Sequence, residues 1–148
     1  MPTEGVARDT PSPMEKRVTL RWTGQGLRFQ GEGGKGPPVP FDGKGEEGLS
    51  PMDALLLSVA GCMAIDIRDI LEKGRVPLSA LDVVVEGERA ASPPRRYVRL
   101  RLTVNTQGVP AGSESKLHRA VELSRDRYCS VLHSLRSDLP LEVVIQNS

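Results

Sequence analysis

The feature that most constrains the fold is a long apolar segment with helix signals at both ends. Ser50 can cap a helix, Pro51 suits the first helical position, and Asp53 completes a capping box. Gly74 suits the cap at the carboxyl end. The first half of the segment is apolar nearly all round, at Leu55, Leu56, Leu57, Val59, Ala60, Met63 and Ile65. We therefore predict a helix over residues 51–73 that is buried by more than one neighbour.

Alternating apolar segments on both sides of this helix predict strands. Six are expected, at residues 17–22, 27–31, 39–41, 81–90, 96–105 and 139–148. Helical segments at 113–126 and 129–137 precede the last strand. Because hairpins rather than crossovers join the strands, we predict mainly antiparallel sheets and the α+β class. Residues 15–148 are expected to form a single domain, after a disordered lead-in over residues 1–14.

The composition argues against several classes of function. A net charge of +1 does not favour nucleic acid or an anionic membrane as a partner. An aromatic content of 3% is too low for a base-stacking surface. The sequence contains no apolar run of membrane-spanning length, and its polar N-terminus does not resemble a secretory signal. We therefore expect a cytoplasmic protein whose cysteines rest as thiols.

Two cysteines, Cys62 and Cys129, are the candidates for chemistry, and they are too few for a disulfide-stapled scaffold. Cys62 lies in the predicted helix next to Gly61, which suggests close packing at that point. Asp66 follows one turn later, and an arginine from a neighbouring strand could pair with it. Cys129 is expected to open a short helix near arginines, which favours its thiolate. The residues alone leave open redox chemistry, a metal site or two buried small hydrophobes, and they rank Cys129 as the more activated thiol.

Three other kinds of site have weaker support. His133 follows Cys129 by four residues, so a Cys–His nucleophilic pair fits the spacing only. The two cysteines with His118 and His133 supply zinc ligand types, but without the clustered spacing of zinc sites. The glycine-rich stretch at residues 31–38 lacks the phosphate-loop motif. We therefore expect no metal and no phosphate site.

Two segments together resemble a known family. SPMDALLLSVAGCMAIDIRDIL, at residues 50–71, and YCSVLHSL, at residues 128–135, are similar to the OsmC/Ohr superfamily, the osmotically induced and organic hydroperoxide resistance proteins. The resemblance is to the OsmC-like branch and extends from about residue 17 to the end. It implies an intertwined homodimer in which antiparallel sheets surround two central helices. It also implies no cofactor, an external dithiol as reductant and a small hydroperoxide as substrate.

The resemblance assigns roles to both cysteines. Cys62 would attack the hydroperoxide as a thiolate and become a sulfenic acid, and Cys129 would resolve it as a disulfide. This reverses the order of activation that the local features give. Family members add an arginine from the N-terminal hairpin, for which Arg28 is the candidate and Arg21 the reserve.

The family's carboxylate is the point of departure. It follows the helix-start proline, where this chain has Met52; Glu46 or Glu47 could replace it. Three hypotheses follow: a thiol-dependent peroxidase, a ligand-binding or redox-sensing dimer with little turnover, and a dimer whose cysteines are only core residues. The peroxidase is the interpretation we favour from the sequence.

Overall fold

The computed structural model describes residues 15–148, so the predicted disorder of residues 1–14 lies outside the described residues. The chain divides into two compact units, one ending at Pro51 and the other running from Met52 to Ser148. That residues 15–148 form one domain stays a prediction. In the described part of the chain, no helix is long and apolar enough to cross a membrane.

The N-terminal unit is a three-stranded antiparallel sheet in the order β1-β2-β3. Its strands, β1 (Val18–Trp22), β2 (Arg28–Gly33) and β3 (Val39–Asp42), match the predicted meander. Asp42 is buried, and its carboxylate accepts hydrogen bonds from the backbone N–H groups of Lys44, Glu47 and Glu46. These bonds lower the pKa of Asp42 and fold the loop after β3 around its side chain.

β1 differs from the half-buried strand that its alternation predicts. The apolar side chains Val18, Leu20 and Trp22 share one face, and they are 80%, 54% and 60% exposed. A period of two residues decides which side chains share a face, but it does not decide what covers that face.

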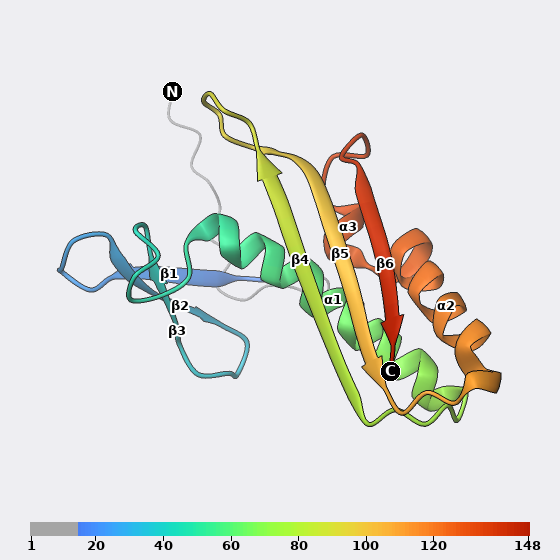
Figure 1. Cartoon of the computed structure of the whole chain (residues 1–148). Helices are drawn as coiled ribbons and strands as arrows, with labels where there is room; N and C mark the ends of the chain where they lie inside the picture. The colour runs from blue at the N-terminus through green and yellow to red at the C-terminus, as the bar shows by residue number, and fades with distance from the viewer. Residues whose placement is uncertain (1–14) are drawn as a thin grey trace. The chain divides into compact units, whose positions relative to one another are not determined.

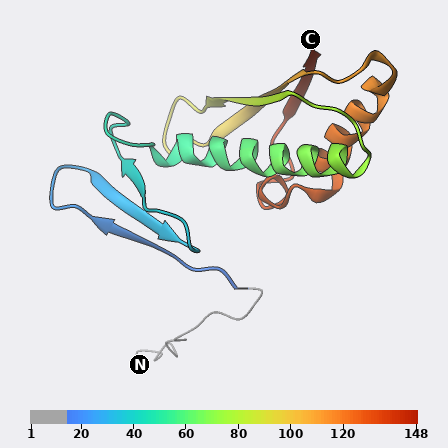
Figure 2. The same ribbon diagram turned by 90° about the horizontal axis from the view of Figure 1, so that it is seen from below.

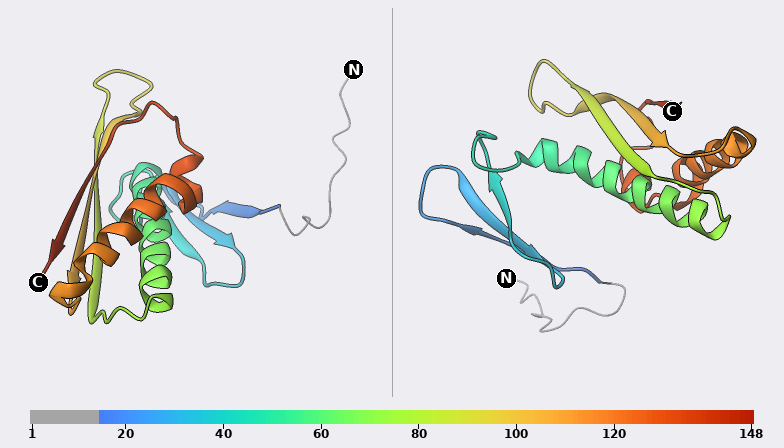
Figure 3. Two further views of the ribbon diagram at one scale, coloured as in Figure 1. Left: turned by 90° about the vertical axis from the view of Figure 1, so that its right-hand side faces the viewer. Right: turned by 60° about the horizontal axis from the view of Figure 1, so that its bottom comes forward.

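The second unit packs helices against a three-stranded sheet in the order β4-β5-β6 (Figure 1). The long helix α1 (Pro51–Lys73) has the predicted bounds, and both α1 and α2 lie on the same face of this sheet (Figure 2 and Figure 3). The remaining elements are β4 (Ala80–Arg89), β5 (Tyr97–Gln107), the 3-10 turn η1 (Ala111–Ser113), α2 (Glu114–Leu123), the π-helical turn η2 (Ser124–Tyr128), α3 (Ser130–His133) and β6 (Leu141–Asn147).

One strand pair departs from the antiparallel expectation. β4 and β5 pair antiparallel, as the predicted hairpin, but β5 and β6 pair parallel. The expectation that hairpins join the strands is therefore wrong for β6, because a parallel partner requires a crossover. α2, η2 and α3 form that crossover, and it brings Cys129 to the helical side of the sheet.

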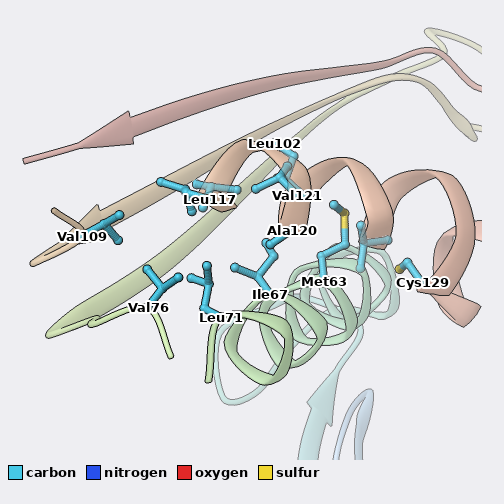
Figure 4. Close-up of a cluster of buried hydrophobic side chains, with 12 residues drawn as sticks. Met63, Ile67, Leu71, Val76, Leu102, Val109, Leu117, Ala120, Val121 and Cys129 are labelled. Atoms are coloured by element: carbon cyan, nitrogen blue, oxygen red, sulfur yellow. The ribbon is translucent and has the colours of Figure 1, made fainter. Parts of the chain in front are cut away.

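The core of this unit lies between α1, α2 and the inner face of β5. Figure 4 shows side chains of α1 and α2 meeting below the sheet, with Cys129 at one end of the cluster. Burial on α1 recurs at helical spacing, which is typical of one face packed against a core. The fully buried members include Val59, Met63, Ile67, Leu102, Val104, Leu117 and Ala120.

A β-bulge at the start of β5 changes which side chain points inward. The alternation predicts Val98 on the core face, yet Val98 is 38% exposed and Tyr97 is buried. The register shifts here, because Glu88 pairs with Arg99 while Arg89 pairs with Tyr97. The bulge inserts one extra residue and turns the alternation by one position.

The opposite side of α1 carries an uncovered apolar stripe, which we define as Leu57, Gly61 and Ile65. Leu57 is 57% and Ile65 is 70% exposed, so the helix is not covered all round as predicted. A Cβ on Gly61 would meet no atom within 4 Å. Among residues 15–148, nothing supplies the close packing that Gly61 suggests.

Candidate functional site

Folding brings the two cysteines together, although they come from distant segments. Cys62 is half-buried on α1, and Cys129 is fully buried at the junction of η2 and α3. Cys62 packs against the buried cluster that contains Cys129. Both are free thiols, and the Cys62 side chain lies close enough to Cys129 to raise the pKa of that thiol. One thiol of the pair is thus partly exposed to solvent and the other is enclosed.

Burial, not the helix end, controls the Cys129 thiol. Cys129 is the N-cap of α3, and its Sγ accepts a hydrogen bond from the backbone N–H of Leu132 at 3.4 Å, which lowers the pKa. Loss of solvation is the larger effect and raises the pKa of Cys129 to about 11. The Cys62 side chain and the charge of Asp66 contribute to this increase. The prediction that Cys129 is the more activated thiol, made from its helix end alone, is therefore wrong.

This shift makes stability depend on pH in one direction. We expect the free energy of unfolding to fall from pH 9.0 to about 11, because the native state keeps Cys129 protonated while the unfolded chain releases that proton. Below pH 9.0, the stabilising contribution of protonated Cys129 is fully present. Urea unfolding under reducing conditions should show a smaller loss for Cys129→Ala over the same range. Tyr97, whose pKa burial also raises, affects both proteins alike, so equal losses would contradict the prediction.

Asp66 has a partner that the sequence did not reveal. Ser124 Oγ donates a hydrogen bond of 2.8 Å to Asp66 Oδ2, and Ser124 is fully buried. The expected partner was an arginine from a neighbouring strand, and that expectation is wrong. The Ser124 carbonyl also accepts a hydrogen bond of 2.8 Å from the backbone N–H of Cys129. Ser124 therefore connects α1 to the segment that carries the second thiol.

The histidines do not complete a nucleophilic pair or a metal site. His133 Nε2 lies 3.0 Å from the backbone carbonyl oxygen of Arg125, so this ring nitrogen is hydrogen-bonded to the backbone and not to a thiol. His118 is exposed on α2. Among residues 15–148, no group of three or more His, Cys, Asp or Glu side chains could hold a metal ion.

The candidate arginines lie in the N-terminal unit. Arg28, at the start of β2, forms an ion pair of 3.8 Å with Glu47, and its charge helps to lower the pKa of Asp42. Arg21 on β1 lies 3.9 Å from Glu32. Glu47 was one of two proposed replacements for the family's carboxylate, and it is the residue that pairs with Arg28. The role of Arg28 toward the thiols stays a prediction.

Met52, which stands where the family has its carboxylate, lies in the first turn of α1. Its backbone carbonyl accepts a hydrogen bond of 2.8 Å from the hydroxyl of Tyr97. This bond connects the start of α1 to the bulge of β5.

A family model described as OsmC-like protein matches residues 43–144. The chain belongs to the OsmC-like protein family. Its resemblance to the OsmC/Ohr proteins and its α+β fold are thereby confirmed. The matched region contains α1, both cysteines and most of the second sheet.

Similar proteins extend this assignment. The OsmC-like chain is 36% identical over 119 residues to protein YhfA of Escherichia coli strain K12, covering 80% of this chain and 86% of YhfA. A hypothetical protein from Aquifex aeolicus VF5 has a similar structure, with a TM-score of 0.80, 27% identity and coverage of 90% of this chain and 96% of that chain. An organic hydroperoxide resistance protein OsmC from Legionella pneumophila shares the fold, with a TM-score of 0.62, 14% identity and coverage of 92% and 99%.

One contact of the candidate site in this OsmC-like protein does not follow from the sequence, the hydrogen bond between Ser124 and Asp66. Ser124 lies within the helix predicted over residues 113–126, and the sequence gives it no role. The signal that could have identified it is the pairing requirement of Asp66, because a carboxylate on a buried helix needs a nearby donor. Several polar residues could meet that requirement, and the π-helical turn that selects Ser124 has no recognisable sequence pattern.

Proposed function

We propose that this OsmC-like protein is a thiol-dependent peroxidase that reduces organic hydroperoxides, with hydrogen peroxide as a second substrate. The observation that carries the proposal is the asymmetric thiol pair, in which Cys62 is partly exposed and Cys129 is enclosed. The name of the Legionella protein supports the proposal, whereas the name YhfA carries no activity.

The proposed reaction has three balanced steps. The Cys62 thiol releases its proton, and the thiolate attacks one peroxide oxygen. The O–O bond breaks, which leaves a Cys62 sulfenic acid, and the departing alkoxide takes up the released proton and becomes an alcohol. The Cys129 thiol then attacks the Cys62 sulfur, giving a disulfide, and its proton leaves with the hydroxyl as water. An external dithiol reduces the disulfide and is itself oxidised. No bound cofactor takes part in these steps.

The raised pKa of Cys129 suits the second role. A protonated, buried thiol does not compete with Cys62 for the peroxide, because the thiolate is the nucleophile. The order of attack proposed from the family is therefore the order that burial favours.

The proposal includes Arg28 as the cation that favours the Cys62 thiolate, as the resemblance implies. Its support is the Arg28–Glu47 ion pair, which supplies the arginine and carboxylate types of the family from neighbouring segments. A cytoplasmic location, where dithiol reductants are available, completes the proposal.

Oxidation followed by intact-mass measurement tests this function. One equivalent of cumene hydroperoxide should convert both thiols into a single intramolecular disulfide, which blocks alkylation of both and is reversed by dihydrolipoamide. Two alkylatable thiols after excess hydroperoxide would reject the peroxidase.

A second candidate function is a redox-sensing or ligand-binding dimer with little turnover. Met52 in place of the family's carboxylate favours it. This alternative predicts that the disulfide forms, but that hydroperoxide is not consumed continuously when dihydrolipoamide is supplied in excess.

We further propose that the protein is a homodimer that buries the α1 stripe. The exposed apolar stripe on α1 supports this proposal, because a two-fold axis would pair the stripe with itself and bury it. Gly61, which has open space around its Cα, would allow two helices to approach closely.

The stripe can be tested by adding bulk at its centre. Gly61→Leu is expected to convert the dimer into monomer, because the new side chain separates two facing helices without a clash inside the chain. Sedimentation equilibrium measures the change. The same substitution at Gly112, which also meets no atom within 4 Å, should leave the dimer intact. A wild-type monomer, or an unchanged Gly61→Leu dimer, would refute the interface.

A further inference from the structure

A cleft of about 440 Å³ lies in the second unit, where three segments meet. Met52 and Leu55 from the first turns of α1 form one wall, and the β4–β5 turn forms another. Leu135 and Leu139, between α3 and β6, form the third wall. The hydroxyl of Tyr97 is bonded to the carbonyl of Met52 at 2.8 Å, which ties two of these walls together. The volume is within the range of small-molecule sites.

Four arginines line the same cleft: Arg89, Arg95, Arg96 and Arg136. Arg136 Nε lies 3.8 Å from Asp138 Oδ1, and its Nη2 donates to the Tyr97 carbonyl at 3.2 Å. Arg89 Nε donates to the Arg95 carbonyl at 2.7 Å. None of Arg89, Arg95 and Arg96 forms an ion pair with a carboxylate of residues 15–148.

The arginines of the cleft that lack an ion pair contrast with two arginines on β5. Arg99 pairs with Glu88, and Arg101 lies 3.8 Å from Glu142. Besides Asp138, the carboxylate of Asp53 lies nearby, because its charge raises the pKa of Tyr97 whereas the charge of Arg89 lowers it. The cleft therefore combines apolar walls with an excess of positive charge at its rim.

We propose that this cleft binds an aliphatic anion, a chain with one carboxylate or phosphate headgroup. The chain lies against Met52, Leu55 and Leu139, and the headgroup is held by the guanidinium groups of Arg95 and Arg96. Guanidinium groups suit both headgroups because their planar donors form paired bonds with two oxygens. This inference goes beyond the proposed peroxidase, since it requires no reaction at the thiols.

Titration calorimetry on the reduced protein tests the proposal with decanoate and decyl phosphate. We expect saturable binding of at least one probe, and the stronger one identifies the headgroup. Decanol lacks the charge and acetate lacks the chain, so each should bind at least about tenfold more weakly than the stronger of the two probes. Within an alkanoate series, affinity should rise by up to about fourfold for each added CH₂ until the cleft is full.

Paired variants test the location. The double variant Arg95→Gln, Arg96→Gln should weaken binding at least about tenfold. The control, Arg99→Gln with Arg101→Gln, removes the same charge from the same hairpin but outside the cleft. It should change the affinity less than about threefold. Circular dichroism checks that both variants fold. No binding of either probe, equal binding of decanol, or equal losses in the two double variants would overturn the proposal. Peroxide consumption is measured separately. If the cleft binds no ligand, the peroxidase proposal is unaffected, and if no peroxide is consumed, the binding proposal is unaffected.

Discussion

Replacing Cys62 by serine is expected to lower hydroperoxide turnover by about 10³-fold or more, because loss of a covalent nucleophile can cost up to about 10⁶-fold. Cys129→Ser should behave differently. The first oxidation of Cys62 remains, but the sulfenic acid is no longer resolved and steady-state turnover is lost. Stopped-flow oxidation and coupled dihydrolipoamide consumption separate these two effects.

The two cysteine variants also decide the order of the thiols. In the Cys129→Ser variant, a diketone probe for sulfenic acids should label Cys62 after one equivalent of hydroperoxide. The opposite pattern, in which Cys62→Ser forms a sulfenic acid at Cys129 and Cys129→Ser does not react, would contradict the proposed roles. It would restore the ranking that the helix end of Cys129 suggested.

The local elements of the fold follow from the sequence because their causes are local. The start of α1 at Pro51 and its end at Lys73 were predicted from capping residues and a terminal glycine. The first five strands agree within about two residues because alternation and turn residues lie within each segment. The parallel pairing of β6 did not follow, because it depends on where a crossover returns the chain.

The candidate site was predicted less completely, since it depends on contacts between distant segments. The two thiols were identified, but the pKa of Cys129 depends on burial by α1 and α2, which its neighbours in sequence do not show. The Asp66–Ser124 bond spans 58 positions and depends on a π-helical turn. Strict alternation along β5 would point Val98 inward, because alternation cannot reveal a bulge.

That bulge leads to the largest stability effect that we predict. Gly87→Ala is expected to lower the free energy of unfolding by about 3 kcal/mol, the upper end of the usual cost of overpacking. A Cβ on Gly87 would lie 2.5 Å from Cδ1 of Tyr97 and 3.2 Å from Cδ2 of Leu100. Tyr97 cannot easily move aside, because its ring is buried and its hydroxyl is bonded to Met52. Urea unfolding monitored by circular dichroism measures the loss.

Two comparisons show whether the clash with Tyr97 is the cause. Gly112→Ala makes the same change in the same unit, but the added Cβ meets no atom within 4 Å, so stability should be unchanged or rise by up to about 1 kcal/mol. In a Tyr97→Ala background the ring is absent, and Gly87→Ala should then cost less than about 1 kcal/mol, a coupling typical of residues in contact. Equal costs at Gly87 and Gly112, or an undiminished cost without the tyrosine ring, would show that the glycine is required for another reason. Because Tyr97 also connects the bulge to the start of α1, the destabilised Gly87→Ala variant should bind decanoate more weakly than the Gly112→Ala variant does.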